Sequence, residues 1–437
     1  MQCVSIRKAE GGFVSKNMDS PQDSYDLVVV GGGTSGVFAA ISAARRGLRV
    51  ALVEASGMLG GTLTQVTLGG ICGAWTGAAH TQVVHGLFDE FVHAMRKAQA
   101  CDGLYSYGHV TALPYEPVKV RYLLDQLLPP NVTTFFHSRL FAVDMEGERI
   151  ARVHLAGVEG PFSLAARAYV DATGNASLAG LCATPLRRGE NGTVQAASSM
   201  FRVIGAEVDP RVRDVRTEIR LAIEKHNASG QAEAFKRSAV AVYVHPDQRL
   251  LHFNATRVYF ESTADDALAA ALDMSRVETE ARKEAFRLVE LLKREVDGFA
   301  NIEIVDLGSS VGVRDSRNIV NDHPLTEAMV RDGDKPANSV AYSAWPIEFH
   351  GSNTQTHWEP LEGDRYYGIP YESCLPQGIQ NALVVGRAIS STPLAQASCR
   401  VTAPCIQMGE SAGIAAHELV ASSSRTAFSE LASMKFI

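Results

Sequence analysis

Residues 25–54 read YDLVVVGGGTSGVFAAISAARRGLRVALVE and hold a strand, a glycine turn, a helix and a second strand in immediate succession. Residues 27–30 are an unbroken apolar run, as expected of a parallel strand buried on both faces, and the run stops at three consecutive glycines. Small residues at helical spacing follow from Thr34, and residues 48–53 form a second apolar run that ends in Glu54. This order predicts a βαβ unit of a parallel sheet.

The glycine spacing in this unit is typical of a dinucleotide site. Gly31 would make the tight turn, Gly33 would let the backbone approach a pyrophosphate, and Gly36 would let the helix pack closely on the strand. The phosphates would then lie at the positive N-terminus of the helix, and Glu54 would bind the ribose hydroxyls. A glycine turn can arise by coincidence, but its place between strand and helix, with an acid at the expected distance, favours the dinucleotide.

A second glycine pair, Gly60 and Gly61, follows Glu54 closely, and NAD-binding Rossmann domains do not need such a pair. The whole pattern resembles the FAD-binding fold of the glutathione reductase type, in the branch shared with fumarate reductase flavoproteins. Within it, the sequence is similar to the FAD-dependent oxidoreductase family that includes heterodisulfide-reductase-subunit-A-like flavoproteins. The resemblance implies bound FAD, with the second glycine pair along its diphosphate and ribityl side.

Two later segments resemble further FAD motifs of this family. An apolar strand ends in Asp171-Ala-Thr-Gly174, as where the family's chain returns to the sheet beside the adenosine half. Residues 381–385 form another buried strand, which ends in Gly386 and Arg387, where many relatives carry an aspartate in place of the arginine. The cofactor-binding residues that the resemblance implies are Gly31, Gly33, Thr34, Ser35, Gly36, Glu54, Ala55, Gly60, Gly61, Thr62, Asp171, Ala172, Thr173, Gly174, Gly386 and Arg387.

The resemblance also bears on how the flavin is held. Relatives similar to succinate dehydrogenase carry it on a histidine before a Gly-Gly-Ile segment, and aligning on residues 69–71 places Leu63 at that position. This implies FAD bound without a covalent link. His80 and His85 remain alternative attachment points, although a structural hydrogen bond is the plainer interpretation of both.

The composition excludes several classes of function. The chain has 437 residues, of which 46% are hydrophobic and 20% charged, and its net charge of -7 argues against a nucleic-acid partner, which needs a basic face. The apolar stretches are too short to cross a bilayer, and the N-terminus lacks the apolar core of a secretory signal, so we expect no membrane association. A small-molecule substrate is the expected partner, and a homo-oligomer is compatible with the sequence.

Seven scattered cysteines suit a reducing compartment, and we therefore expect a cytoplasmic protein. None forms a C-x-x-C motif, and the nearest pair, Cys399 and Cys405, lies near the C-terminus. A redox-active disulfide beside the flavin or an iron–sulfur cluster would need a closer grouping. The sequence therefore predicts buried free thiols and no metal site.

The expected fold class is α/β, with a Rossmann-like FAD-binding domain of a parallel sheet plus an antiparallel meander, and an inserted α+β substrate domain. The meander is expected from four short strands at 132–136, 140–145, 150–155 and 161–165, and helices are expected at 86–98, 117–128 and 265–295. A last helix would begin around Thr402 as its N-cap, with Gly409 and Gly413 on one smooth face. The expected units are a flexible tail 1–23, an FAD-binding part 24–195, a substrate or cap domain 196–365, a second FAD-binding part 366–425 and a C-terminal tail 426–437.

The candidate catalytic residues lie in the second half of the chain. The segment Gly312-Val-Arg314-Asp-Ser-Arg317 matches a Gly-x-Arg-x-x-Arg segment that in the resembled family lies near the substrate side of the flavin. Arginine suits a substrate carboxylate because its fork gives two parallel hydrogen bonds. The candidates are Arg314, Arg317 and Arg400 for binding a carboxylate, and His350, His357, Tyr367 and Tyr371 for proton transfer. A structural hydrogen bond is the plainer alternative for each.

One dinucleotide fingerprint is visible, whereas disulfide reductases that use NADPH carry a second. Aromatic hydroxylases usually show Asp-Gly midway and Gly-Asp at the end, where this chain has Asp171-Ala172 and Gly386-Arg387. We therefore predict an FAD-dependent oxidoreductase that exchanges a hydride between flavin N5 and a small organic substrate, with a carboxylate-bearing compound as the first candidate, as a dehydrogenase or oxidase. The alternatives are an NAD(P)H-dependent flavin monooxygenase or reductase, an electron-transfer subunit with an iron–sulfur partner, and a flavin-binding protein without catalysis.

Overall fold

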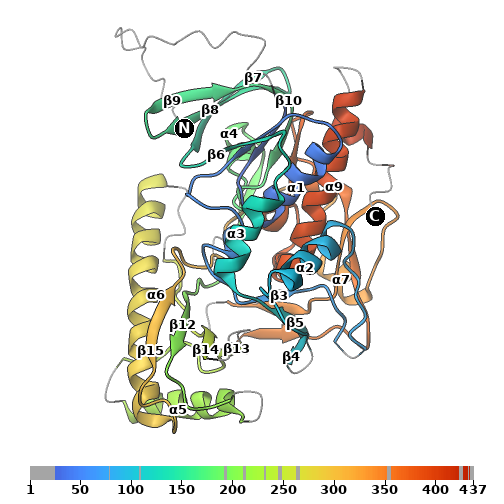
Figure 1. Ribbon diagram of the computed structural model, residues 1–437. Coiled ribbons are helices and arrows are strands. Elements are labelled where there is room, and N and C mark those ends of the chain that lie inside the picture. The colour runs from blue at the N-terminus through green and yellow to red at the C-terminus, as the bar shows by residue number, and fades with distance from the viewer. Residues whose placement is uncertain are drawn as a thin grey trace.

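The computed structural model describes residues 25–433 except 78, 108–109, 191–193, 210–212, 231–232, 245–248, 262–265, 352–355, 423–426 and 432 (Figure 1). The expected tail 1–23 lies outside the described residues. Both parallel and antiparallel sheets are present, which confirms the expected mixed fold class.

The N-terminal βαβ unit forms the centre of a five-stranded parallel sheet in the order β21-β10-β1-β2-β6. Its strands are β1 (Tyr25–Val30), β2 (Val50–Val53), β6 (Val132–Phe135), β10 (Ala166–Asp171) and β21 (Ala382–Val384). β1 lies between β10 and β2, and both of its faces are covered, because Leu27 and Val29 belong to one hydrophobic cluster and Val28 and Val30 to another. This burial on both faces explains why residues 27–30 are all apolar.

One strand of the expected meander belongs to the parallel sheet instead. β6 pairs with β2 in parallel, because it follows helix α3 (Pro117–Leu127) and so returns in the same direction as β2. The meander therefore has three strands, β7 (Arg139–Glu146), β8 (Arg149–Gly157) and β9 (Gly160–Leu164).

Two helices pack against each other on the parallel sheet, α1 (Thr34–Arg45) and α9 (Thr402–Ala421) (Figure 1). A Cβ added at Gly409 would lie 2.2 Å from the carbonyl oxygen of Ser35, and one at Gly413 would lie 2.5 Å from Cβ of Ser42. This confirms the smooth face expected on the last helix. The N-cap is Val401 rather than Thr402, which is the first helical residue.

A second core lies in an antiparallel region around a sheet of order β13-β14-β12-β15, at the lower left of Figure 1. Its elements are β12 (Met200–Ile204), α5 (Val215–Ser229), β13 (Ala241–Val244), β14 (Leu250–Asn254), α6 (Ala267–Glu295) and β15 (Glu303–Leu307). Phe201 and Phe253 stack at its centre with ring centroids 5.0 Å apart. The buried guanidinium of Arg202 joins this sheet to the rest of the chain through Glu116, at 2.8 Å.

Short elements complete the fold. They are β3 (Gly70–Cys72), α2 (Leu87–Lys97), β4 (Tyr105–Tyr107), β5 (Val110–Pro114), α4 (Ser177–Leu181), β11 (Leu186–Arg188), β16 (Arg317–Ile319), α7 (Glu327–Asp332), β17 (Ser339–Ser343), β18 (Ile347–Phe349), β19 (His357–Glu359), β20 (Tyr367–Pro370) and α8 (Pro393–Cys399). β18 and β19 pair in antiparallel fashion.

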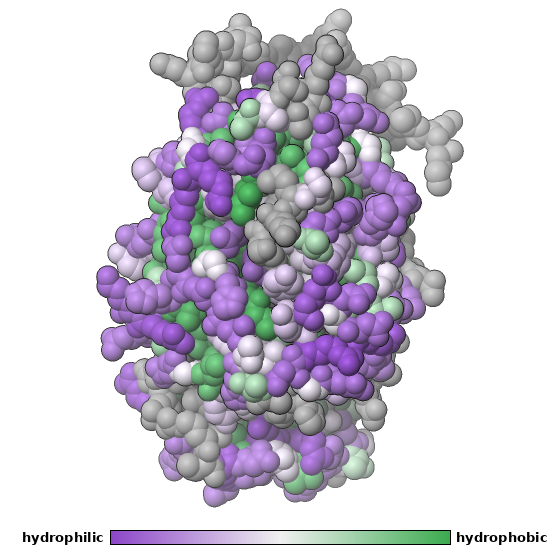
Figure 2. All heavy atoms as spheres, turned by 90° about the vertical axis from the view of Figure 1, so that its right-hand side faces the viewer, coloured by the Kyte–Doolittle hydropathy of each residue, from purple (hydrophilic) through white to green (hydrophobic). Residues whose placement is uncertain are grey.

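The surface and the thiols agree with the composition. Hydrophilic side chains cover most of the face shown in Figure 2, and apolar ones lie scattered between them. Within the described part of the chain, no helix combines the length and apolar character needed to cross a membrane. The six described cysteines are free, and all except Cys182 are buried.

A candidate cofactor cradle and an arginine cavity

The glycine turn after β1 contains two glycines that close packing requires, and a third, Gly33, that packing does not explain. A Cβ at Gly31 would lie 2.4 Å from the carbonyl oxygen of Ala172, and one at Gly36 would lie 1.8 Å from that of Gly31. Both glycines are therefore required for the helix to approach the sheet. A Cβ at Gly33 would meet nothing within 4 Å. The space beside Gly33 is open, as a group held by the turn would need.

The second glycine pair lies against this turn. Gly60 pairs with Gly33 in an isolated parallel bridge, and the Thr34 hydroxyl donates to the carbonyl oxygen of Gly60 at 3.3 Å. Gly60 and Gly61 both have positive φ, at 102° and 51°, which glycine adopts without strain. We call the two glycine segments, residues 31–36 and 60–61, the cofactor cradle.

Glu54 lies beside the cradle, but its carboxylate also has a structural task. Oε2 accepts a hydrogen bond from the backbone nitrogen of Gly32 at 2.8 Å, and Oε1 accepts one from that of Ser56 at 2.7 Å. Oε1 also lies 3.5 Å from Nε2 of Gln65, whereas Oε2 keeps a further lone pair for a hydroxyl group. The predicted role toward a ribose therefore stays a prediction, and Ala55 beside it is exposed.

The later motifs meet the cradle at the same edge of the sheet. Asp171 is buried and accepts from the backbone nitrogen of Thr173 at 3.1 Å and from that of Ala179 at 3.0 Å, so it braces the turn into α4. Burial raises the pKa of Asp171. Arg387 donates from Nε to the carbonyl oxygen of Gly174 at 2.6 Å, so the two motifs are in direct contact.

Gly386 completes this edge. A Cβ there would lie 2.9 Å from Oγ of Ser35, at the start of α1. The motifs therefore follow the carboxyl ends of β1, β2, β10 and β21, where parallel sheets place their ligands.

A cavity of about 410 Å³ opens next to the cradle, between the parallel sheet and the antiparallel region. Thr62 reaches it from the second glycine segment, Arg387 from the closing motif, and Thr402 from the N-terminus of α9. Apolar side chains, among them Met200 and Trp345, form much of the wall. The hydroxyl oxygen of Thr402 is buried without a hydrogen-bond partner among the described residues.

Arginines dominate the charge of the cavity, and we call it the arginine cavity. Its described lining contains five arginines and one carboxylate, Glu348; the arginines are Arg216, Arg237, Arg314, Arg387 and Arg400. The excess of positive charge in a buried space favours an anionic ligand.

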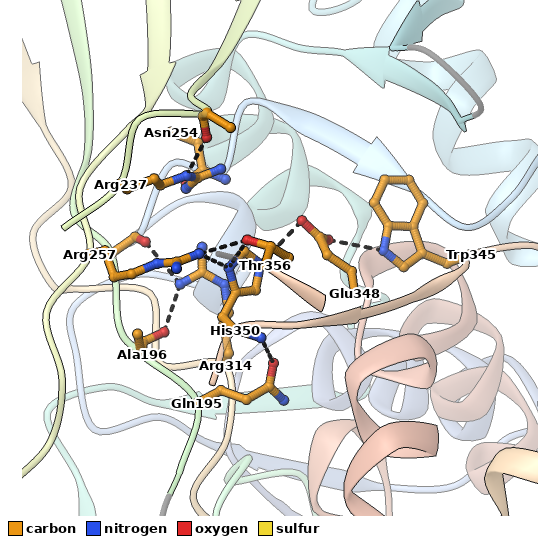
Figure 3. Close-up of polar contacts among 12 residues, drawn as sticks. Gln195, Ala196, Arg237, Asn254, Arg257, Arg314, Trp345, Glu348, His350 and Thr356 are labelled. Atoms are coloured by element: carbon orange, nitrogen blue, oxygen red, sulfur yellow. Dashed lines mark hydrogen bonds and ion pairs between the residues drawn. The ribbon is translucent and has the colours of Figure 1, made fainter. Parts of the chain in front are cut away.

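Hydrogen bonds to neutral groups fix three of the arginines. Arg314 donates from Nη1 to the carbonyl oxygen of Ala196 at 2.7 Å, and Arg237 donates from Nη1 to the side-chain oxygen of Asn254 at 2.8 Å (Figure 3). Arg400 donates from Nη2 to the carbonyl oxygen of Glu348 at 3.2 Å, whereas its Nε is buried without a partner in the described part of the chain. Burial and the charges of Arg400 and Arg237 hold the pKa of Arg314 well below its ordinary value.

Glu348 and His350 form a polar pair on the wall of the arginine cavity (Figure 3). Oε1 of Glu348 lies 3.1 Å from Nε2 of His350, and Oε2 accepts from Nε1 of Trp345 at 3.2 Å. On its other side, Nδ1 of His350 lies 3.0 Å from Nη2 of Arg257.

The structure brings three of the seven candidate catalytic residues together in the arginine cavity, namely Arg314, His350 and Arg400. Arg317 and Tyr367 are not among its described lining residues. Arg317 lies in β16, and its side chain lies near Gly180 of helix α4. A Cβ built on Gly180 would be 3.6 Å from Nη1 of Arg317. Tyr367 is fully buried, and its hydroxyl lies 2.6 Å from Oγ of Ser398.

The two other candidates for proton transfer are also not among the described lining residues of the cavity. His357 pairs with Glu359 at 2.6 Å, and Tyr371 donates to the carbonyl oxygen of Phe428 at 2.9 Å. Sequence reasoning missed Arg237 and Glu348. A signal existed for Glu348, because residues two apart in a strand share a face and His350 follows it at that distance.

The alternative attachment histidines lie outside the described lining of the arginine cavity. His80 is exposed, with Nε2 3.3 Å from Oγ of Ser106, and His85 is exposed beside Asp89, with 3.4 Å between ring nitrogen and carboxylate. Leu63 is buried in the core.

Comparison with known proteins identifies a family. A family model described as FAD dependent oxidoreductase matches residues 26–436. Among curated proteins, the dihydrolipoyl dehydrogenase of Trypanosoma brucei brucei is 60% identical over 42 residues, which are 10% of this chain and only 9% of that protein.

The chain also matches solved structures, at low identity and low TM-score. The p-nitrophenol 4-monooxygenase PnpA from Pseudomonas putida is 12% identical with a TM-score of 0.45, over 92% of this chain and 82% of that one. A geranylgeranyl bacteriochlorophyll reductase-like protein from Thermoplasma acidophilum is 14% identical with a TM-score of 0.46, over 92% and 80%. Such distant likenesses do not bear on the activity of this chain.

Proposed function

The chain belongs to the FAD-dependent oxidoreductase family, and on this premise we propose that it exchanges a hydride between FAD and a small organic acid held in the arginine cavity, as a dehydrogenase or oxidase. The single observation that carries the proposal is the excess of five arginines over one carboxylate in a cavity that adjoins the cofactor cradle. FAD, when bound, supplies an acceptor for two electrons and a proton in the form of a hydride.

The residues of the cofactor cradle fit FAD. The open space beside Gly33 leaves room for a diphosphate, and the unpartnered hydroxyl of Thr402 lies at the end of a helix of 20 residues that opens on the arginine cavity. The partial positive charge of that helix end favours a negative charge nearby. Gly33, Gly61 and Glu54 would hold the nucleotide half, and Thr62 and Thr402 would lie beside the flavin, which we propose is bound without a covalent link.

The arginine cavity favours an acid over a neutral substrate for an electrostatic reason. Arg314, Arg237 and Arg400 repel one another in a buried space, and this repulsion contributes to the lowered pKa of Arg314. A carboxylate placed among them would relieve the repulsion and accept charge-assisted hydrogen bonds, which are stronger than those between neutral groups. An ester or amide of the same acid carries no charge to relieve the repulsion, and its carbonyl oxygen would accept weaker hydrogen bonds than a carboxylate does.

An anaerobic screen tests this proposal. Small hydroxy and amino acids are mixed with the oxidised, FAD-loaded protein, each beside its methyl ester, and the flavin absorbance is followed. We expect one or more acids to bleach the flavin while the matching esters bleach it far more slowly. Equal rates for acid and ester would contradict the carboxylate site. Rapid bleaching by NADPH, with no response to any acid, would instead favour a reductase or monooxygenase.

A further inference from the structure

The carboxylate of Glu348 faces the arginine cavity together with the imidazole of His350. Glu348 belongs to β18 and His350 follows its end, so the two side chains lie two residues apart and extend from the same face of the chain (Figure 3). We propose that Glu348 is the catalytic residue that accepts the substrate's proton, and that His350 is its positioning residue. This inference rests on the proposed function, because it concerns the same cavity.

The contacts of His350 determine which of its ring nitrogens carries hydrogen. Nη2 of Arg257 lies 3.0 Å from Nδ1, and a guanidinium can only donate. Nδ1 therefore accepts, and the hydrogen of the neutral ring is on Nε2, which donates to Oε1 of Glu348 at 3.1 Å. Both nitrogens are engaged in this way, so His350 is not free to take a proton from a substrate. Its ring instead fixes one oxygen of Glu348.

The charges around Glu348 keep it ionised. The groups that face it are Cys72 from β3, Tyr243 from β13, and Arg237, Arg314, Arg400 and His350. Burial alone would raise the pKa of Glu348, but the hydrogen bond from His350 and the charges of Arg400 and Arg314 hold it well below its usual range. Burial and the charge of Arg314 likewise hold the pKa of His350 well below its ordinary value, so the ring is neutral.

The arginine cavity can adjust the basicity of Glu348 to the presence of substrate. A bound carboxylate would neutralise positive charge at Arg314 and Arg400, and the pKa of Glu348 would rise because those charges hold it low. The base would thus become stronger when the substrate arrives. Without this coupling a carboxylate of very low pKa would be a poor acceptor at neutral pH.

The step balances in atoms and electrons. Oxidation of a hydroxy or amino acid breaks the C–H bond and the neighbouring O–H or N–H bond, and forms a carbon–oxygen or carbon–nitrogen double bond. Bound FAD would supply the acceptor for the hydride and its two electrons. Glu348 accepts the proton on a carboxylate oxygen and becomes a neutral carboxylic acid, which returns the proton to solvent when the product leaves.

The first test separates binding from turnover in Glu348→Gln. Glutamine keeps the shape of the side chain but removes its negative charge. We expect the FAD-loaded variant to bind benzoate about tenfold more tightly than the wild type by calorimetry, because the negative charge of Glu348 no longer repels the benzoate carboxylate. We expect flavin reduction by an acid found in the screen to fall by roughly a hundredfold or more, the usual contribution of a positioned base.

A matched control comes from the same pair of strands. Glu359 lies opposite Ile347 in β19 and pairs with Arg331 at 2.7 Å, and it is not among the described lining residues of the arginine cavity. Glu359→Gln should leave benzoate affinity and flavin reduction unchanged. Weaker benzoate binding by Glu348→Gln, or wild-type flavin reduction in that variant, would overturn the inference. Failure of the wild type to bind benzoate at all would remove the anion site and with it both proposals.

The second test addresses His350 without using turnover. In protein labelled with ¹⁵N at histidine and tryptophan, the Nε2–H form of His350 and the indole signal of Trp345 should both be visible by NMR, because Trp345 donates to the other oxygen of Glu348. Glu348→Gln should shift both signals. His350→Gln, which can donate to Glu348 and accept from Arg257, should keep the Trp345 signal and most of the rate.

The contrasting variant is His350→Leu, which should shift the Trp345 signal and move the acid limb of the pH–rate profile upward. Leucine cannot donate a hydrogen bond to Oε1 of Glu348, so one of the interactions that hold the pKa of Glu348 low is lost. A doubly protonated or Nδ1–H ring in the wild type would overturn the assignment. If no acid in the screen bleaches the flavin, the proposed function is refuted. The benzoate and NMR results would still show whether Glu348 faces a bound anion.

Discussion

The cofactor cradle and the arginine cavity adjoin each other, but one is built from backbone and the other from side chains. In the cradle, a single added methyl group at Gly36 would lie 1.8 Å from a carbonyl oxygen. In the cavity, arginines from distant segments are fixed by carbonyl and amide oxygens, and what they share is charge. The cradle therefore depends on space and the cavity on electrostatic balance. Variants of the two should separate cofactor binding from turnover.

The largest effect is expected from Gly33→Val, which should abolish FAD binding and leave a folded protein. Gly33 has φ −71° and ψ −171°, a conformation that valine adopts readily, and a Cβ there meets nothing within 4 Å. The new side chain would instead occupy the space of the diphosphate. The measurement is flavin per chain after purification, together with the melting temperature of the apoprotein.

Gly103→Val is the matched control for this change, since a Cβ at Gly103 also meets nothing within 4 Å and the residue lies outside the cofactor cradle. That variant should keep full flavin. Full FAD occupancy in Gly33→Val would show that the open space beside the turn serves another purpose.

The same contrast explains what could be predicted from the sequence. The cradle could be predicted because its strand, its glycine turn and the 12-residue helix α1 follow one another directly in the sequence. The cavity draws Arg237, Arg314, Glu348 and Arg400 from separate segments of the chain, and their meeting depends on how the antiparallel region packs against the parallel sheet. Arg314 could be found because it lies in a family-like segment. Arg237 carries no local signal of that kind.

The meander shows a similar limit. Residues 132–135 have the composition of a short strand, and the sequence could not decide whether they join β7 or β2. The decision rests on the preceding helix, which returns the chain in parallel to β2. Strand content was thus predictable while strand partnership was not.

The next effect concerns stability behind the cavity wall, at Glu284. Its Oε2 accepts from the backbone nitrogen of Arg257 at 3.0 Å, and its Oε1 is buried without a partner in the described part of the chain. Burial raises the pKa of Glu284 from 4.5 to about 7. The folded protein therefore holds this proton more tightly than the unfolded chain does, so the contribution to stability is greatest below the unfolded pKa and is lost as pH rises toward 7.

Glu284→Gln should accordingly stabilise the protein at about pH 8 by up to about 3 kcal/mol and have little effect at about pH 4. Urea unfolding of both proteins across this range measures the difference. A benefit that is equal at both ends of the range would show that Glu284 does not titrate between them.

A smaller effect is expected from Arg314→Met, which should keep FAD and slow flavin reduction by the acid substrate. The loss of a charge-assisted hydrogen bond costs about 1.5–3 kcal/mol, or a ten- to hundredfold change in rate. Arg317→Met is the control, because Arg317 belongs to the same motif but lies outside the described lining of the cavity. Loss of FAD in Arg314→Met would make Arg314 part of the cofactor site, and equal effects of both variants would argue against a substrate role.

The smallest effect is expected from Tyr367→Phe, at a residue that the sequence placed among the catalytic candidates. Oγ of Ser398 already donates to the carbonyl oxygen of Trp345 at 2.6 Å, so the Tyr367 hydroxyl must donate to Ser398, and its proton points into the core. Burial also raises the pKa of Tyr367, which makes it a poor acid or base near neutral pH.

Removing the hydroxyl should lower stability by about 1 kcal/mol and leave flavin reduction within roughly twofold of the wild type, because one buried hydrogen bond is lost and no group facing the substrate changes. Tyr371→Phe, which loses a hydrogen bond to a backbone carbonyl elsewhere in the core, should behave alike in thermal unfolding and turnover. A tenfold slower reduction in Tyr367→Phe alone, with FAD and melting temperature intact, would return Tyr367 to the site and extend the catalytic region beyond the arginine cavity.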